Sequence, residues 1–101
     1  MYRQCAIGVD WDESKNLSNY RKHEVYFETA ILVFDDPNAV MFRDRVVDGE
    51  DRWHTIGTVE GVLLLPVVHT IEDAAEDELV RIISARKATA RERRLYEDGE
   101  E

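Results

Sequence analysis

Cysteine is almost absent from this chain of 101 residues, which contains only Cys5, two prolines and five glycines. A single cysteine excludes an intrachain disulfide and a cysteine-based zinc site, and it favours a reducing, intracellular setting. Long apolar runs are also missing, since the longest, Val62 to Val68, has seven residues and includes a proline. The sequence therefore predicts neither a signal peptide nor a membrane span, and we expect a cytoplasmic protein.

Several signatures of well-known catalytic sites are missing as well. The chain has no glycine-rich phosphate loop, no nucleophile elbow and no paired histidine or cysteine spacing for a metal. Its three histidines are isolated in the sequence, so each is expected to be structural or exposed rather than a ligand. We therefore predict neither a metal nor a cofactor.

Positive charge is scarce overall, because 22 acidic residues outnumber 13 basic ones and give a net charge of −9. Five of the acidic residues lie in 72–78 and four lie in 97–101, and without these nine the remaining 13 equal the basic residues in number. The net charge argues against a strong general affinity for nucleic acid, because phosphate contacts dominate such binding. It leaves room for a local cationic cleft.

The remaining pattern predicts a single α+β domain over 1–101, in which a short N-terminal strand and two helices pack on a mainly antiparallel four-stranded sheet, followed by a C-terminal helix. The first helix is expected from the cap Asp12 to about His23, with Leu17 and Tyr20 as its buried stripe. The second is expected over about Tyr26–Phe34. The expected strands are Gln4–Trp11, Ala39–Val47, Arg52–Val59, Val62–Thr70 and Leu79–Ala85, and the closing helix is about Ala90–Glu97.

The connections carry further predictions. Turns are expected at Asp48–Asp51 and at Glu60-Gly61, and Pro66 implies an edge or a bulge because proline cannot donate to a strand ladder. Ile71–Glu78 is expected to be an acidic loop. Gly99 is a predicted C-cap, and the acidic tail 98–101 is expected to fray.

The stretch Arg81–Arg94 changes from a strand pattern to a helix pattern. Thr89 and Glu92 fit the capping box, in which a hydroxyl and a carboxylate satisfy backbone N–H groups reciprocally. Between Arg86 and Arg94 there are five basic residues and one acidic residue. Such a stretch can hold arginines against a phosphate; the simpler interpretation is a terminal strand and helix with a solvated basic face.

A scattered set of cations, one histidine and one carboxylate is what remains for chemistry. Cleavage of RNA without a metal needs a base for the 2′-hydroxyl, cations for the phosphorane and an acid for the leaving oxygen. A short connection between the two helices could bring Lys22, His23 and Glu28 together, and arginines clamp phosphates in bidentate fashion. Taken singly, each residue has a structural explanation, such as a first-turn carboxylate for Glu28.

Read as a whole, the chain resembles the BrnT family of type II toxins over about residues 9 to 97. The pieces that carry this resemblance, in unbroken order, are Trp11-Asp12, Lys15-Asn16, Asn19, Lys22-His23, Val25, Phe27-Glu28, Ala30, Val33-Phe34, Asp36-Pro37, Asp44, Gly49-Glu50, Arg52, Ile56-Gly57, Leu63–Val68, Thr70, Arg81–Thr89, Arg91–Arg94 and Tyr96-Glu97.

The resemblance implies a RelE-like fold and an endoribonuclease that halts translation. It also implies neutralisation by an antitoxin of the BrnA type, a ribbon-helix-helix protein through which the complex would contact DNA only indirectly. Combined with the chemistry above, it gives a site in which Glu28 or His23 is the base and Arg86 is the main phosphate clamp. The predicted catalytic residues are His23, Glu28 and Arg86, and the predicted RNA-binding residues are Lys22, Arg52, Arg81, Lys87 and Arg91.

The chain departs from the family pattern at three places. Glu24 stands where a glycine is usual after Lys-His, so a left-handed cap there would cost about 1 kcal/mol more. Pro66 replaces an aliphatic residue, and an acidic stretch follows Thr70. Carboxylates near an RNA site would repel the substrate, or they could face a basic part of the antitoxin. The alternative hypothesis is therefore a non-catalytic binding protein of RelE or ParE type, or a decayed toxin that acts in an autorepressor complex.

Overall fold

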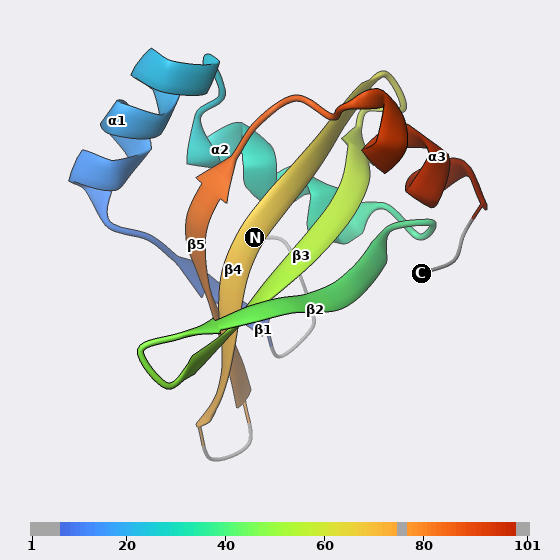
Figure 1. The fold of residues 1–101 in the computed structure, drawn as a ribbon. Helices are drawn as coiled ribbons and strands as arrows, with labels where there is room; N and C mark the ends of the chain where they lie inside the picture. Colours follow the sequence, from blue (N-terminus) through green and yellow to red (C-terminus); the bar gives the residue numbers. More distant parts are fainter. Residues whose placement is uncertain (1–6, 75–76, 99–101) are drawn as a thin grey trace.

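The computed structural model describes residues 7–74 and 77–98 and confirms the predicted α+β class (Figure 1). The elements in chain order are β1 (Ile7–Asp10), α1 (Glu13–His23), α2 (Phe27–Ala30), the 3-10 helix η1 (Ile31–Asp35), β2 (Val40–Val47), β3 (Glu50–Val59), β4 (Leu63–Ala74), β5 (Asp77–Ala85) and α3 (Ala90–Asp98). The predicted start of the first strand at Gln4, the C-cap Gly99 and the tail 99–101 lie outside the described residues. Asp98, expected to fray, is the last residue of α3.

The sheet has five strands in the order β1-β5-β4-β3-β2, one more than the four predicted. The N-terminal strand is the addition: β1 pairs in parallel with β5, while every other pair in the described sheet is antiparallel. Adding β1 covers the edge of β5, whose backbone groups would otherwise be unpaired. The two strands lie far apart in the chain, so no local sequence pattern predicts their pairing.

The hydrophobic core lies between the sheet and the segment α2–η1. Phe27, Ala30 and Val33 are buried against Leu65 and Val67 of β4. The prediction of one continuous helix over 26–34 is wrong in its second half, which is the 3-10 helix η1. The three buried residues are spaced by three, which suits the 3.0 residues per turn of a 3-10 helix better than an α-helical stripe.

The two predicted turns are confirmed, and helix α1 ends in a left-handed cap. Asp48-Gly49 and Glu60-Gly61 both have positive φ, as tight hairpin turns require. Glu24 ends α1 in the left-handed region, with φ 63° and ψ 32°. Glu24 therefore adopts a conformation that is sterically unfavourable for a residue with a Cβ and that glycine adopts most easily.

The acidic stretch is not the loop that was predicted. Strand β4 continues to Ala74 and β5 begins at Asp77, so the two strands form a long hairpin that extends the sheet (Figure 1). Pro66 fits the predicted irregularity in a specific way. It pairs with Ile56 of β3, and pairing of β4 with β5 begins only at Val67, so the missing N–H lies just beyond the end of β5.

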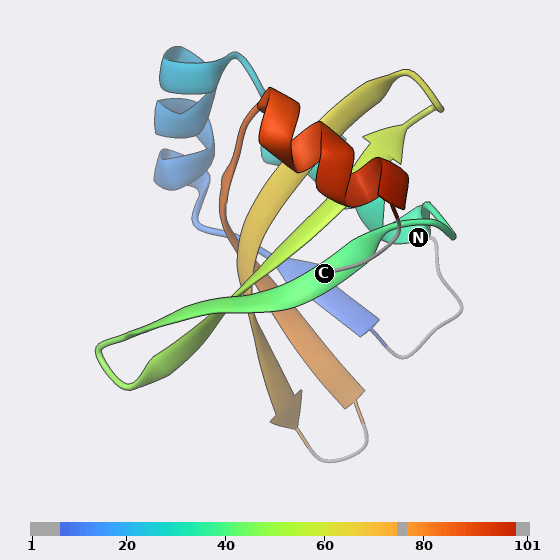
Figure 2. The same cartoon turned by 45° about the vertical axis from the view of Figure 1, so that its right-hand side comes forward.

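Helix α3 crosses the side of the sheet opposite α2, as the two views agree (Figures 1 and 2). The Tyr96 hydroxyl donates to an Asp36 carboxylate oxygen over 2.7 Å, and the Ala88 N–H bonds the Leu64 carbonyl. These contacts cover the end of the sheet near Ile56, which is fully buried. No helix among residues 7–74 and 77–98 is long and apolar enough to cross a membrane.

Candidate functional site

The sheet leaves part of one face uncovered between α3, the end of α1 and the β2–β3 hairpin. Because Leu65, Val67 and Val59 point to the core, the alternate residues of β3 and β4 point to this other side. We call this surface the open face. It is formed by Phe42, Arg45, Arg52, His54, Val68, Thr70, Arg81 and Ser84.

His54 lies at the centre of the open face. It pairs with Phe42 on one side and Val68 on the other, and Val68 pairs in turn with Ser84. Its side chain is 13% exposed, and its Nδ1 lies 4.0 Å from an Asp44 carboxylate oxygen. Its Nε2 is buried and has no hydrogen-bond partner among the described residues. Because this nitrogen is buried, a substrate would contact it only if the side chain turned.

Burial lowers the pKa of His54, and Arg86 and Arg45 act in the same direction. The carboxylates of Asp44 and Glu92 oppose the shift by stabilising the imidazolium. The net effect keeps the imidazole neutral at pH 7, the form that can accept a proton.

Arg86 and Glu92 form a bidentate ion pair at the border of the open face. The Arg86 Nη1 and Nη2 donate to the two Glu92 carboxylate oxygens over 2.8 and 2.7 Å. The hydrogen bonds from Arg86 lower the pKa of Glu92 to about 2, and the same bonds raise the pKa of Arg86. Glu92 is also one half of the predicted capping box, which is confirmed by its reciprocal bonds with Thr89. The predicted phosphate clamp is thus held in place by α3.

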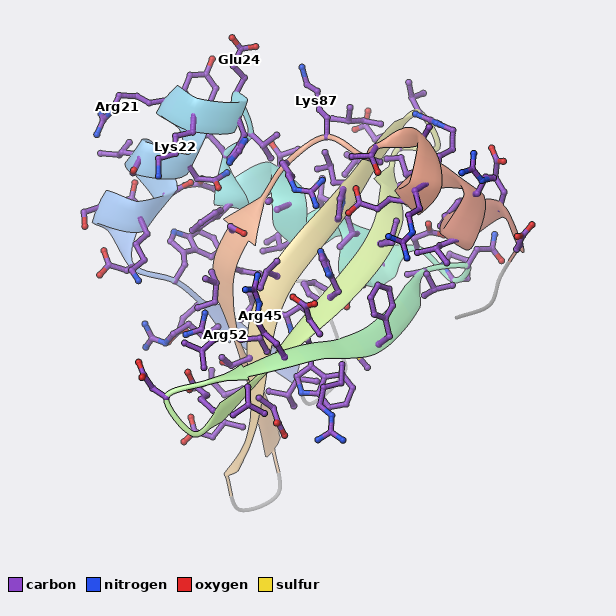
Figure 3. All side chains as sticks on the ribbon, viewed as in Figure 1. Arg21, Lys22, Glu24, Arg45, Arg52 and Lys87 are labelled. Carbon is purple, nitrogen blue, oxygen red and sulfur yellow. The ribbon has the colours of Figure 1, made fainter. Side chains whose placement is uncertain are left out.

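Three further arginines lie on the open face in one row. Arg45 pairs with Arg52 across β2 and β3 (Figure 3). Arg81 pairs with Thr70 across β5 and β4. Arg81 also makes an ion pair with Asp10 at 3.3 Å. Asp44 and Glu50 lie 3.5 and 3.7 Å from Arg45 and Arg52, so the row presents three guanidiniums on the open face, each beside a carboxylate.

Lys22 and His23 lie at the end of α1 beside the β5 edge of the open face. Together with Lys15, Ser18 and Asn19 they line a shallow groove that also contains Ile83 and Ser84. Ser84 is in the same cross-strand row as His54. The structure therefore brings Lys22 and His23 to the side of the open face that lies opposite Asp44.

Glu28 is not brought together with Lys22 and His23. Its carboxylate accepts a hydrogen bond from the Asn16 amide over 2.9 Å, and Asn16 also accepts from the Phe27 N–H over 2.7 Å. Asn16 lies six residues before Lys22, which is about 9 Å along the helix axis. The chain turns back after Glu24, so α2 starts beside the middle of α1 rather than at its end.

The predicted RNA-binding residues Lys87 and Arg91 lie at the edge of the open face. Lys87 is exposed and points away from the sheet (Figure 3), and Arg91 is exposed on α3.

His69 is fully buried against Thr55 and Phe34, and burial lowers its pKa to about 4, so it is a structural histidine. Within 7–74 and 77–98, no group of three His, Cys, Asp or Glu side chains could hold a metal ion.

The sequence reasoning missed four residues of this site: Asp44, Arg45, His54 and Glu92. A signal existed for His54, because the alternation of a strand places it on the same face as Arg52. Arg45 carried no such signal. In a regular strand Arg45 would lie on the same face as Arg43, because the two are two residues apart. A register shift between Arg43 and Arg45 places Arg45 opposite Arg52 instead.

Comparison with known proteins gives the family of the chain and supports its fold. Residues 11–92 match the family model described as the ribonuclease toxin, BrnT, of type II toxin–antitoxin systems. The chain is also similar to the crystal structure of the Brucella abortus ribonuclease toxin BrnT, with 25% sequence identity and a TM-score of 0.65. The alignment covers 82% of this chain and 97% of that one. No curated protein matches the sequence.

Proposed function

The chain belongs to the BrnT family of ribonuclease toxins of type II toxin–antitoxin systems, and we propose that it cleaves RNA on the open face without a metal ion. Cleavage of messenger RNA in the cytoplasm would halt translation. We propose further that a BrnA-type antitoxin neutralises the protein and that the complex contacts DNA only through this antitoxin.

One arrangement carries the proposal: a neutral, largely buried histidine between a carboxylate and a rigid arginine. His54 has Asp44 on one side and the Arg86–Glu92 pair on the other. Arg45, Arg52 and Arg81 add cations across the same surface. A base beside several phosphate-binding cations is what metal-free cleavage of RNA requires.

The reaction needs two proton transfers around one phosphate. His54 takes the proton of the 2′-hydroxyl, whose oxygen then bonds to phosphorus while the bond to the 5′-oxygen breaks. A second group gives a proton to that leaving oxygen, and the products are a 2′,3′-cyclic phosphate and a 5′-hydroxyl. We assign the second role to His23, because its groove borders Ser84, about 10 Å from His54 across two strand spacings.

Arg86 stabilises the negative charge of the phosphorane in this scheme, with Lys22 as a second cation. Glu92 positions the guanidinium through two hydrogen bonds, which leaves the outer edge of the fork for the phosphate. Glu28 as the base is the competing assignment. Its contact with Asn16 favours a structural role at the start of α2.

The antitoxin proposal has support at the surface of α1. Leu17, Tyr20 and Tyr26 are exposed to 46%, 40% and 41%, and the two tyrosine rings stack 4.0 Å apart. Grouped apolar side chains of this kind often mark a surface that a partner covers.

The test is cleavage of single-stranded RNA in excess EDTA by the wild type and by His54→Gln, Arg86→Ala and Glu28→Gln. We expect His54→Gln and Arg86→Ala each to lower the rate about 100-fold or more, and Glu28→Gln to change it little. Arg43→Ala is the matched control, since Arg43 is an exposed arginine of β2 on the opposite side of the sheet. Because the pKa of His54 is lowered, the loss of rate that reports protonation of the base should occur below the ordinary histidine range.

Other outcomes have distinct meanings. Cleavage that requires added Mg²⁺ would contradict the metal-free mechanism. A large loss in Glu28→Gln alone would move the base to Glu28. Intact RNA in every lane, with growth unaffected when the protein is expressed without an antitoxin, would favour the non-catalytic binding protein.

A further inference from the structure

Two arginines stand directly opposite each other on the open face. Arg45 of β2 and Arg52 of β3 are cross-strand partners, and their side chains lie side by side (Figure 3). Like charges in this position are destabilising. The pairing also depends on the register shift between Arg43 and Arg45, without which Arg45 would point to the other side. The fold thus places a second cation beside Arg52 through a local irregularity.

Neither arginine is well neutralised by the described residues. The Arg45 Nε lies 3.5 Å from Asp44, and this arginine side chain is 73% exposed. The Arg52 Nη2 lies 3.7 Å from Glu50, and the Arg52 Nε is buried without a hydrogen-bond partner among the described residues. By comparison, the Arg86 guanidinium makes two hydrogen bonds to Glu92, at 2.8 and 2.7 Å, which are shorter than both of these contacts. Each of the two arginines therefore has one loosely paired carboxylate, and among the described residues the two arginines share none.

The position of the pair suggests which anion this is. Arg52 is two residues from His54 on β3, about 7 Å along the strand on the same face. This distance is comparable to the distance between neighbouring phosphates of an extended RNA single strand. A phosphate held near His54 and Arg86 would therefore place the next phosphate of the same strand between Arg45 and Arg52.

Resting on the proposed ribonuclease function, we infer that Arg45 and Arg52 together bind the phosphate next to the scissile one. The substrate is accordingly single-stranded RNA with at least two consecutive phosphates, lying along β3 from α3 toward the β2–β3 hairpin. Two guanidiniums around one phosphate would remove the repulsion between them.

The test compares a dinucleoside monophosphate, which has only the scissile phosphate, with a tetranucleotide. We expect the wild type to prefer the tetranucleotide in kcat/KM. Arg45→Ala and Arg52→Ala should each lower kcat/KM for the tetranucleotide about tenfold more than for the dinucleotide. Arg43→Ala, the exposed arginine on the opposite side of β2, should leave both values unchanged. Equal losses on both substrates, or no loss, would overturn the inference.

A binding measurement separates this inference from the proposed chemistry. Fluorescence anisotropy with a labelled 2′-deoxy tetranucleotide, which cannot be cleaved by this route, needs no catalysis. The Arg45→Ala/Arg52→Ala double variant should bind more weakly and should reduce the slope of log Kd against log salt by about 0.7, the value for one single-strand phosphate. If the wild type binds but does not cleave, the proposed function fails and the subsite stands. If the double variant keeps the wild-type slope, the subsite fails.

Discussion

Two asparagines connect α1 to the rest of the molecule. Asn16 joins α1 to α2 through Glu28 and the Phe27 N–H, and it is 1% exposed. Asn19, at 6%, donates to the carbonyls of Val25 and Ala85 and accepts from the Ala85 N–H. Each amide thus satisfies backbone groups that have no partner within a helix or strand. Helix α1 is fixed by hydrogen bonds more than by apolar burial.

These asparagines explain why the buried side of α1 was predicted wrongly. Leu17 and Tyr20 were expected to be its buried stripe, but they are exposed to 46% and 40%. Periodicity measures only apolar spacing, and it gives no weight to a polar side chain that receives partners from distant segments. For the same reason His54 looked like an isolated histidine, since Asp44 and Glu92 reach it only through strand pairing and the crossing of α3.

Replacing Asn16 should therefore cost much more stability than replacing its apolar neighbour. Asn16→Ala leaves the buried Phe27 N–H without an acceptor, and we expect the free energy of unfolding to fall by about 2 kcal/mol or more. Leu17→Ser removes an exposed side chain and should change it by less than about 0.5 kcal/mol. Urea unfolding at pH 7 measures both. Similar losses in the two variants would show that α1 is held by apolar contacts instead.

At the scale of elements, local signals were reliable and long-range ones were not. The capping box of Thr89 and Glu92 and the hairpin turns at Gly49 and Gly61 depend on residues close in sequence, and all three are present as predicted. The parallel pairing of β1 with β5, and the length of the β4–β5 hairpin, depend on the edge of a sheet that already exists. Acidic residues disfavour strands, so local propensity predicted a loop there.

The left-handed cap at Glu24 offers a test at this scale. Glu24→Gly should raise the free energy of unfolding by about 1 kcal/mol, because glycine adopts φ 63° without a steric cost. Glu24→Ala is the control, since it removes the carboxylate from the negative end of the helix and keeps the Cβ. Thermal or urea unfolding of the three proteins gives the comparison. If alanine stabilises as much as glycine, the charge rather than the backbone is responsible.

At the scale of the whole molecule, one set of carboxylates lies next to the arginines around His54 and a second set lies on the β4–β5 hairpin. The arginines of the open face, with Lys22 and Arg86, lie around His54, whereas residues 72–74 of β4 and 77–78 of β5 belong to the far end of the β4–β5 hairpin (Figure 1). Glu72 is about 13 Å along β4 from Val68, the neighbour of His54, and Ala74 is about 20 Å from it. The net charge of −9 is therefore a poor guide to the electrostatic potential that a substrate meets near His54.

Neutralising the hairpin should accordingly leave catalysis almost unchanged. At physiological salt the Debye length is about 8 Å, so charges at about 13 to 20 Å are largely screened from the scissile phosphate. We expect a variant with Asp73, Asp77 and Glu78 changed to their amides to cleave RNA within about twofold of the wild-type rate at 150 mM salt, and somewhat faster at 10 mM, where the Debye length is about 30 Å. Arg43→Gln, a one-charge change on an exposed residue that faces away from His54, is the reference for nonspecific effects. A gain of tenfold or more at 150 mM would mean that the carboxylates repel the substrate directly, as they would if the RNA ran along the full length of β4.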